Sequence, residues 1–219
     1  AFVSSMSGAH WGGSEVLWSE TARYFAEKGH DVQVACPKWP ARPHPVTKLI
    51  EEHKVKVWEY NTHPDSQKSL KKKILDKILR KPDVDEKREW LRNSAIDLLC
   101  ISSGHATEGV SWMQLAREEG IPYITIAHSC AEFLWPVDQE AEYFIPLFAS
   151  AVRCFFVSQG NLNLFQTQLG CTFTNAGLIP NHAAALWNID VPWPQPKDHT
   201  WKLACLGRLN PVAKGQEIL

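Results

Sequence analysis

Short apolar segments alternate with helix-like segments along most of this 219-residue chain, and this alternation restricts the fold more than any other feature. The apolar segments have few polar residues at alternate positions, which is typical of strands buried on both faces of a sheet. We expect strands at residues 2–5, 32–36, 55–58, 96–101, 123–127, 152–157 and 177–180. Strands separated by helices form parallel sheets. The sequence therefore predicts an α/β fold, a parallel sheet with helices on both faces.

Glycine residues follow the segments in which we expect helices. Those segments span residues 14–28, residues 108–119 and a stretch that ends near residue 170. Glycine ends helices because it adopts the left-handed conformation without strain. The glycines at these ends are Gly29, Gly120 and Gly170. The first helix has an apolar stripe that we expect to face the core, made of Leu17, Thr21, Ala22 and Phe25.

A proline-rich segment near the end of the sequence divides the chain into two parts. Residues 191–200 have the composition of a linker, so we expect residues 1–190 to form one domain. Residues 201–219 then contain an apolar strand, a turn with Arg208 and the start of a helix pattern at Lys214. We therefore expect this last part to be the first strand and turn of a second, truncated domain.

The overall charge and the cysteine pattern exclude several classes of protein. A net charge of −1 gives no general attraction to nucleic acid or to anionic membranes. No run of about 18 apolar residues is present, so we expect no transmembrane helix. The six cysteines form no CxxC pair and the histidines form no HxxxH pair. We therefore expect free thiols in a reducing cytosol, no metal site and no cofactor.

Small and polar residues follow several of the expected strands, and in open parallel sheets ligands bind where the strands end. They are Gly12, Gly13, residues 102–107, His128, Ser129, Ser158 and Asn181. Two adjacent glycines before a helix allow a phosphate to approach the helix N-terminus, or they form an ordinary tight turn. Neither GxGxxG nor GxxxxGKS/T occurs, which argues against a dehydrogenase and against a P-loop enzyme.

The order of these residues resembles a known family. The sequence Gly-Gly-Ser-Glu at 12–15 opens a helix, His128 ends a strand, and Val157-Ser158 and Ile179-Pro180-Asn181 end two more. Gly-Arg-Leu at 207–209 and Lys-Gly at 214–215 complete the set. The arrangement is similar to the GT-B glycosyltransferases of family 4, retaining enzymes that use nucleotide sugars, and it covers most of the chain. One departure is His182, which follows the asparagine where the family usually has glycine.

The resemblance implies a Rossmann-like domain on the acceptor side at residues 1–190. It also implies that residues 201–219 begin the domain that binds the nucleotide-sugar donor. In this arrangement Arg208 and Lys214, together with the backbone amides of Gly12 and Gly13, bind the donor diphosphate. Such groups neutralise the charge that grows on the leaving diphosphate, without a metal ion.

His128 is the candidate catalytic residue, and the resemblance gives it a hydrogen bond to the donor sugar. The alternative is an ordinary histidine at the end of a strand. Candidates for contact with the acceptor or the sugar are His10, Trp11, Glu15, His105 and Trp135. The two tryptophans offer flat apolar faces on which sugars stack. Glu15 has the alternative of complementing the dipole of the helix that it opens.

Residues 68–81 form a separate feature, with an apolar stripe on a segment rich in lysine. Such a helix lies on anionic membranes, or it packs on the sheet with a solvated basic face. We expect a cytoplasmic protein. The first alternative would add peripheral contact to the inner face of a membrane and access to a lipid-linked acceptor.

We expect a glycosyltransferase that transfers a sugar, such as a hexose, from a nucleotide sugar to a glycan, lipid or small-molecule acceptor with retention of configuration. We expect the present fragment to be inactive without a donor-binding domain. Two alternatives remain at this point, namely a nucleotide-sugar epimerase of the same fold and a ligand-binding module without catalysis. We expect no nucleic-acid partner.

Overall fold

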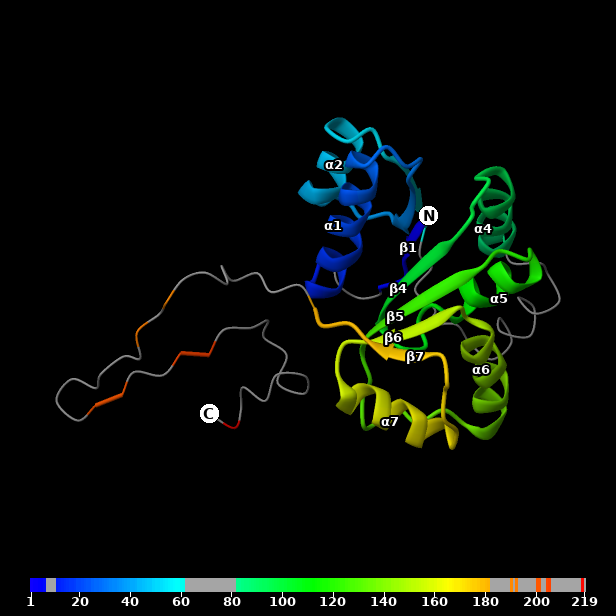
Figure 1. The fold of residues 1–219 in the computed structure, drawn as a ribbon, viewed down its shortest axis with the longest axis vertical. Coiled ribbons are helices and arrows are strands. Elements are labelled where there is room, and N and C mark those ends of the chain that lie inside the picture. Colours follow the sequence, from blue (N-terminus) through cyan, green and yellow to red (C-terminus); the bar gives the residue numbers. More distant parts are fainter. Residues whose placement is uncertain are drawn as a thin grey trace. The chain divides into compact units, whose positions relative to one another are not determined.

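The computed structural model describes residues 1–6, 11–61, 82–181, 190, 192, 200–201, 204–205 and 218. The chain forms two compact units, Ala1–His182 and Ala183–Leu219. Every helix and strand discussed below belongs to the first unit (Figure 1). Three predicted features lie outside the described residues, wholly or for the most part. They are the basic helix at 68–81, the linker at 191–200, and the strand and turn at 201–219.

A seven-stranded parallel sheet forms the centre of the first unit, with the order β3-β2-β1-β4-β5-β6-β7. The strands are β1 (Phe2–Ser4), β2 (Gln33–Pro37), β3 (Lys56–Tyr60), β4 (Leu99–His105), β5 (Tyr123–Ser129), β6 (Arg153–Phe156) and β7 (Ala176–Leu178). All seven predicted strands are present, and the predicted α/β parallel fold is confirmed. The chain order reverses between β1 and β4, which makes the carboxyl ends of these two strands the expected ligand position.

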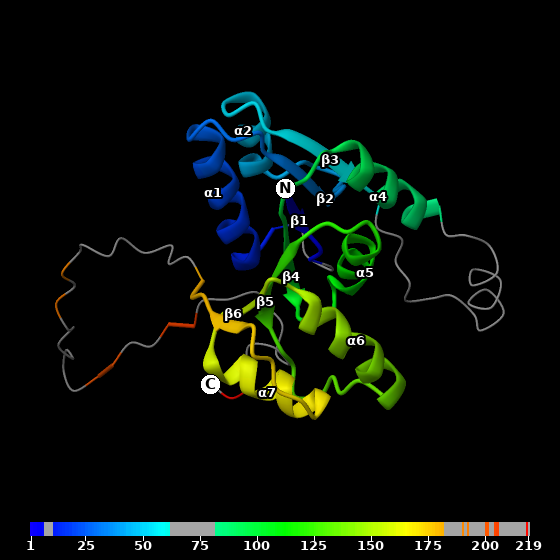
Figure 2. The ribbon, with the colours of Figure 1, turned by 45° about the vertical axis from the view of Figure 1, so that its right-hand side comes forward.

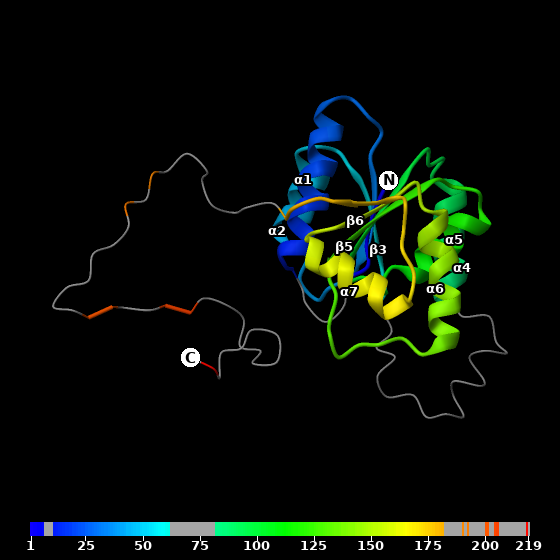
Figure 3. The same cartoon turned by 60° about the horizontal axis from the view of Figure 1, so that its bottom comes forward.

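Helices cover both faces of the sheet. They are α1 (Gly13–Glu27), α2 (His44–Glu51), α4 (Pro82–Asn93), α5 (Val110–Glu118), α6 (Asp138–Ser150) and α7 (Gln159–Leu169). Figures 2 and 3 show α1 and α2 on one face, and α4, α5 and α6 on the other. The aromatic rings of Phe148 in α6 and Phe165 in α7 lie 4.7 Å apart between centroids, so α7 packs beside α6.

Two apolar clusters correspond to the two faces. Phe2, Val34 and Cys100 point toward α1 and α2, where they pack with Trp18 and Ala22. The neighbouring strand residues, such as Val3, Ala35 and Ile101, point the other way and pack under α4 to α7. Alternate burial on two covered faces explains why the strands are apolar at nearly every position.

The glycines predicted to end helices have the required conformation. The backbone φ angles are +86° at Gly29, +68° at Gly120 and +62° at Gly170, all in the left-handed region. Ser158 begins α7 by accepting a hydrogen bond from the backbone amide of Asn161 at 3.2 Å. The ends of three helices therefore follow local rules that are visible in the sequence.

The prediction for the apolar stripe of α1 was only partly correct. Ala22 is buried in the core, and the partly buried Leu17 packs against the same cluster. Leu17, Thr21 and Phe25 also line an open apolar groove of about 430 Å³ between α1 and the sheet, and Phe25 is 39% exposed. The groove exists because α1 and α2 cover only part of this face.

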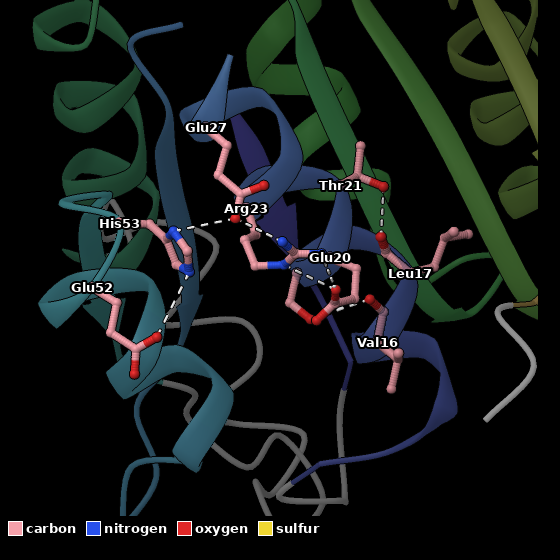
Figure 4. Close-up of polar contacts among 9 residues, drawn as sticks. Val16, Leu17, Glu20, Thr21, Arg23, Glu27, Glu52 and His53 are labelled. Carbon is pink, nitrogen blue, oxygen red and sulfur yellow. Dashed lines mark hydrogen bonds and ion pairs between the residues drawn. The ribbon is translucent and has the colours of Figure 1, made fainter. Parts of the chain in front are cut away.

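Polar contacts hold the outer side of α1 and join it to the end of α2 (Figure 4). Arg23 contacts Glu20 at 2.9 Å and Glu27 at 2.7 Å. His53, just after α2, lies 3.7 Å from Glu27 and 4.0 Å from Glu52. Because Arg23, Glu20, Glu27 and Glu52 are exposed, these pairs contribute little to stability. None of the described helices is long and apolar enough to cross a bilayer.

Candidate functional site

The carboxyl ends of β1, β4 and β5 carry polar side chains that divide between the two faces of the sheet. Ser102 in β4 and His128 in β5 each lie two residues after a core residue on the α1 face, Cys100 and Ile126. His105 lies on the opposite face, in line with Ile101. The sequence predicted one cluster of strand-end residues, whereas the structure forms two.

His128 forms the centre of a hydrogen-bonded group on the α1 face. Its Nε2 atom lies 3.1 Å from Ser102 Oγ, and its Nδ1 atom lies 2.6 Å from Asn181 Oδ1. An amide oxygen only accepts hydrogen bonds, so the ring proton is on Nδ1, which donates a hydrogen bond to Asn181 Oδ1. Nε2 then accepts from the Ser102 hydroxyl group. Burial lowers the pKa of His128, against a smaller opposite effect of Asn181, so the ring is neutral at neutral pH.

The backbone of His128 is also held. The side-chain amide of Asn161, in the first turn of α7, donates to the His128 carbonyl oxygen at 3.4 Å. Asn161 was not among the predicted site residues, and no motif in the sequence singles it out. The group therefore joins β4, β5, the segment after β7 and the start of α7.

Gly12 is the N-cap residue of α1, and Gly13 is its first residue. Gly12 has an extended backbone with φ of −153°, and its carbonyl oxygen accepts from the Glu15 amide at 3.0 Å. Neither glycine is among the residues with positive φ. A Cβ atom added to Gly13 would have no neighbour within 4 Å, and one added to Gly12 would meet Met6 Sδ at an ordinary 3.5 Å. Within the described structure, neither backbone strain nor close packing requires glycine at these positions.

Glu15 differs from an exposed carboxylate that simply complements the helix dipole. Its side chain is only 4% exposed, and its Oε2 atom accepts from Ser4 Oγ at 2.8 Å and from Trp18 Nε1 at 2.9 Å. Its Oε1 atom has no hydrogen-bond partner among the residues that the structure describes. Burial raises the pKa of Glu15, and the hydrogen bonds from Ser4 and Trp18 partly oppose this. The carboxyl group therefore ties the first turn of α1 to the end of β1.

His105 and Trp135 belong to the second group, on the face covered by α5 and α6. His105 Nδ1 lies 3.1 Å from Thr107 Oγ1, and Nε2 accepts from the backbone amide of Ala131 at 3.4 Å. Burial lowers the pKa of His105. Trp135 is exposed, and its indole nitrogen donates to the Glu132 carbonyl oxygen at 2.7 Å. Among the described residues, no side-chain hydrogen bond joins His105 or Trp135 to His128.

The remaining predicted residues lie elsewhere or outside the description. Trp11 is half-buried on the α1 side, with its ring 6.1 Å from that of Trp18. His10, Arg208 and Lys214 lie outside the described residues. Among the residues that the structure describes, no three histidine, cysteine or acidic side chains are grouped to hold a metal ion.

Residues 11–182 match the profile of Glycosyltransferase Family 4. The chain belongs to this family. The match covers nearly the whole first unit, including both strand-end groups. The expected resemblance is therefore confirmed at the level of the family. A search of curated proteins found no match.

This family 4 domain also resembles solved glycosyltransferase structures. HepE of Anabaena, in complex with UDP and glucose, is 16% identical with a TM-score of 0.55, covering 82% of this chain and 44% of HepE. A glycosyltransferase from Rickettsia africae is 12% identical with a TM-score of 0.58, covering 82% of this chain and 42% of its own. These likenesses concern the fold, and the chain spans less than half the length of either protein.

Proposed function

We propose that this family 4 domain is the acceptor-side domain of a retaining glycosyltransferase that uses a nucleotide sugar. A further domain would supply the rest of the donor site, as the partial coverage of related structures suggests. Structures of HepE hold UDP or UDP-glucose, which supports a nucleotide sugar as the donor class. The acceptor would be a glycan, a lipid or a small molecule.

The observation that carries this proposal is the open glycine pair at the start of α1. A 15-residue helix directs its free amides and the positive end of its dipole toward this position. Since neither φ nor packing among the described residues explains Gly12 and Gly13, close approach of a ligand is the reason that we propose for them. A diphosphate fits this position, and Arg208 and Lys214 would add positive charge from the following domain.

His128 is proposed to hold the donor sugar through a hydrogen bond. Of its two partners, Ser102 is buried and fixes one nitrogen, whereas Asn181 is exposed. A sugar hydroxyl group would replace the exposed amide oxygen of Asn181 and accept a hydrogen bond from Nδ1–H of His128. The neutral ring would donate without placing a second positive charge beside the sugar, where an oxocarbenium-like charge develops.

The test uses the full-length protein, a panel of nucleotide sugars and measurement of the released nucleotide, first without and then with acceptors. Gly13→Ala is expected to slow turnover and Gly13→Val to abolish it, because each side chain fills the space proposed for the diphosphate. Both variants should be at least as stable as the wild type, because glycine weakens helices and a Cβ atom at this position meets no described neighbour. Gly160→Ala, at another helix start, is the matched control and should turn over normally.

Normal turnover in Gly13→Val would remove the glycine pair from the site. His128→Ala should lower turnover far more than it lowers thermal stability. The anomeric configuration of the product, followed by NMR, tests retention. An isomerised nucleotide sugar formed without any acceptor would favour an epimerase. Micromolar binding of a nucleotide sugar to residues 1–219 alone, measured by calorimetry, would contradict the division of roles between the two domains.

A further inference from the structure

Five consecutive residues between β5 and α6 form an exposed apolar surface, which we call the apolar tip: Phe133, Leu134, Trp135, Pro136 and Val137. The exposed fractions are 70% for Phe133, 47% for Leu134, 57% for Trp135 and 59% for Val137. Scattered apolar residues are common on protein surfaces, but a contiguous group of this size marks a binding surface.

Hydrogen bonds hold the apolar tip in place. Leu134 donates from its backbone amide to the Ala131 carbonyl oxygen at 3.2 Å, and the Trp135 indole donates to the carbonyl oxygen of Glu132 at 2.7 Å. At the far end, the Val137 amide donates to Glu140 Oε2 at 3.2 Å. The exposure of the apolar side chains is therefore a property of an ordered loop.

The base of the apolar tip is attached to the strand ends. The Ala131 amide donates to His105 Nε2 at 3.4 Å, and the Ala131 carbonyl oxygen accepts from Gln168 at 2.8 Å. The loop follows β5, the strand that carries His128, and leads to α6 (Figure 2). The apolar tip thus begins near the carboxyl ends of the strands, where the proposed site also lies.

The segment that carries the apolar tip has a negative charge. Glu132 precedes it and Asp138, Glu140 and Glu142 follow it, and residues 129–150 contain no lysine, arginine or histidine. These carboxylates repel the donor diphosphate and the headgroups of an anionic bilayer. An uncharged apolar molecule is the occupant that fits both the side chains and the charge.

We propose that the apolar tip binds an uncharged apolar group carried by the acceptor. This inference rests on the proposed function, in which the α1 face takes the donor diphosphate. The aromatic rings of Phe133 and Trp135 would cover the apolar group, while the acceptor hydroxyl group extends toward the end of β5. The acceptor class is therefore an amphipathic molecule, such as a glycoside with an aryl or alkyl aglycone.

The test compares methyl, phenyl and octyl glycosides of one sugar with the full-length protein. Replacing both Phe133 and Trp135 with serine should lower kcat/KM for the phenyl and octyl glycosides by about tenfold, the loss typical of removing aromatic anchors. The value for the methyl glycoside should change little. Val152→Ser is the matched control, since Val152 is also 54% exposed but lies before β6 at the opposite edge. Donor hydrolysis without acceptor should be unchanged in Val152→Ser, which shows that the control variant leaves the donor site intact.

Ligand-observed NMR of the octyl glycoside provides a readout that does not depend on turnover. Binding that the double variant loses would support the apolar tip even if no nucleotide sugar were hydrolysed, so this result separates the inference from the proposed function. Equal losses for all three glycosides would overturn the inference. A large drop in thermal stability with unchanged acceptor preference would assign the apolar tip to a domain contact. Loss of flotation with neutral vesicles, again with unchanged preference, would assign it to a membrane.

Discussion

Gly109 offers a strong test of the packing at the carboxyl end of β4. It lies just before α5 with φ of −84°, so alanine would cause no backbone strain. A Cβ atom at this position would lie 2.6 Å from Ser103 Oγ and 2.7 Å from Ile101 Cγ2. Both neighbours are buried in the strand, so neither moves without shifting β4 or α5. Gly109→Ala should therefore lower the free energy of unfolding by about 2–3 kcal/mol, in the upper part of the range for overpacked cores.

Urea unfolding of residues 1–219, followed by circular dichroism, measures this effect. For a domain of this size the melting temperature should fall by about 4–12 °C. Gly160→Ala is the control of opposite sign, because its Cβ atom would have no neighbour closer than 3.8 Å and glycine weakens helices. It should raise the free energy of unfolding by up to about 1 kcal/mol. Unchanged or increased stability of Gly109→Ala would refute the argument from close packing.

Three other predictions concern buried groups. Because burial raises the pKa of Glu15, the native state binds its proton more tightly than the unfolded chain, and stability is lost as the pH rises through the raised pKa. Glu15→Gln should therefore increase stability at neutral pH and flatten its pH dependence in urea titrations; a steeper profile would contradict this. Burial raises the pKa of Cys36 and of Cys100 to about 12, so iodoacetamide should label the exposed Cys205 first, as peptide mass spectrometry would show. Tyr60→Phe removes a 2.7 Å hydrogen bond to the carbonyl oxygen that ends β1, and should lower the free energy of unfolding by about 1–3 kcal/mol in urea; an unchanged midpoint would show that this carbonyl finds another donor.

The strands were predictable wherever burial on both faces makes a continuous apolar run. The apolar run that begins at Tyr123 predicted the first residue of β5 correctly. The strand predicted at 96–101 begins later, at Leu99, and continues to His105. Its last residues are small or polar, although Ser102 and Ser103 are buried. A search for apolar runs therefore misses the end of this strand.

Three helices were not predicted. Pro146 lies inside α6, where proline argues against a helix. Pro45 lies in the first turn of α2, where proline is tolerated, but α2 has only 8 residues and so gives a short periodic pattern. The third, α4, is mostly charged and has little apolar signal. Packing supplies what the local sequence lacks, as Phe148 at the end of α6 illustrates by contacting Phe165.

The position of His128 was predictable, but its partners were not. Ser102 is opposite Ile126 in the β4–β5 register and so lies diagonally beside His128. Asn181 reaches the same ring from 53 residues further along the chain. Registers and long-range contacts of this kind depend on the whole sheet, which is why the sequence indicated one set of strand ends rather than two separate groups.

The position of β1 in the middle of the sheet has a consequence for synthesis on the ribosome. Phe2 pairs with Val34 on one side and with Cys100 on the other, and Ser5 Oγ donates to Ser103 Oγ, 98 positions later. At ribosomal rates β4 emerges roughly 5–20 s after β1. During that interval β1 is the open edge of a growing sheet, with unpaired backbone groups that attract other strands. The nascent domain therefore exposes an unpaired strand until β4 is available to cover this edge.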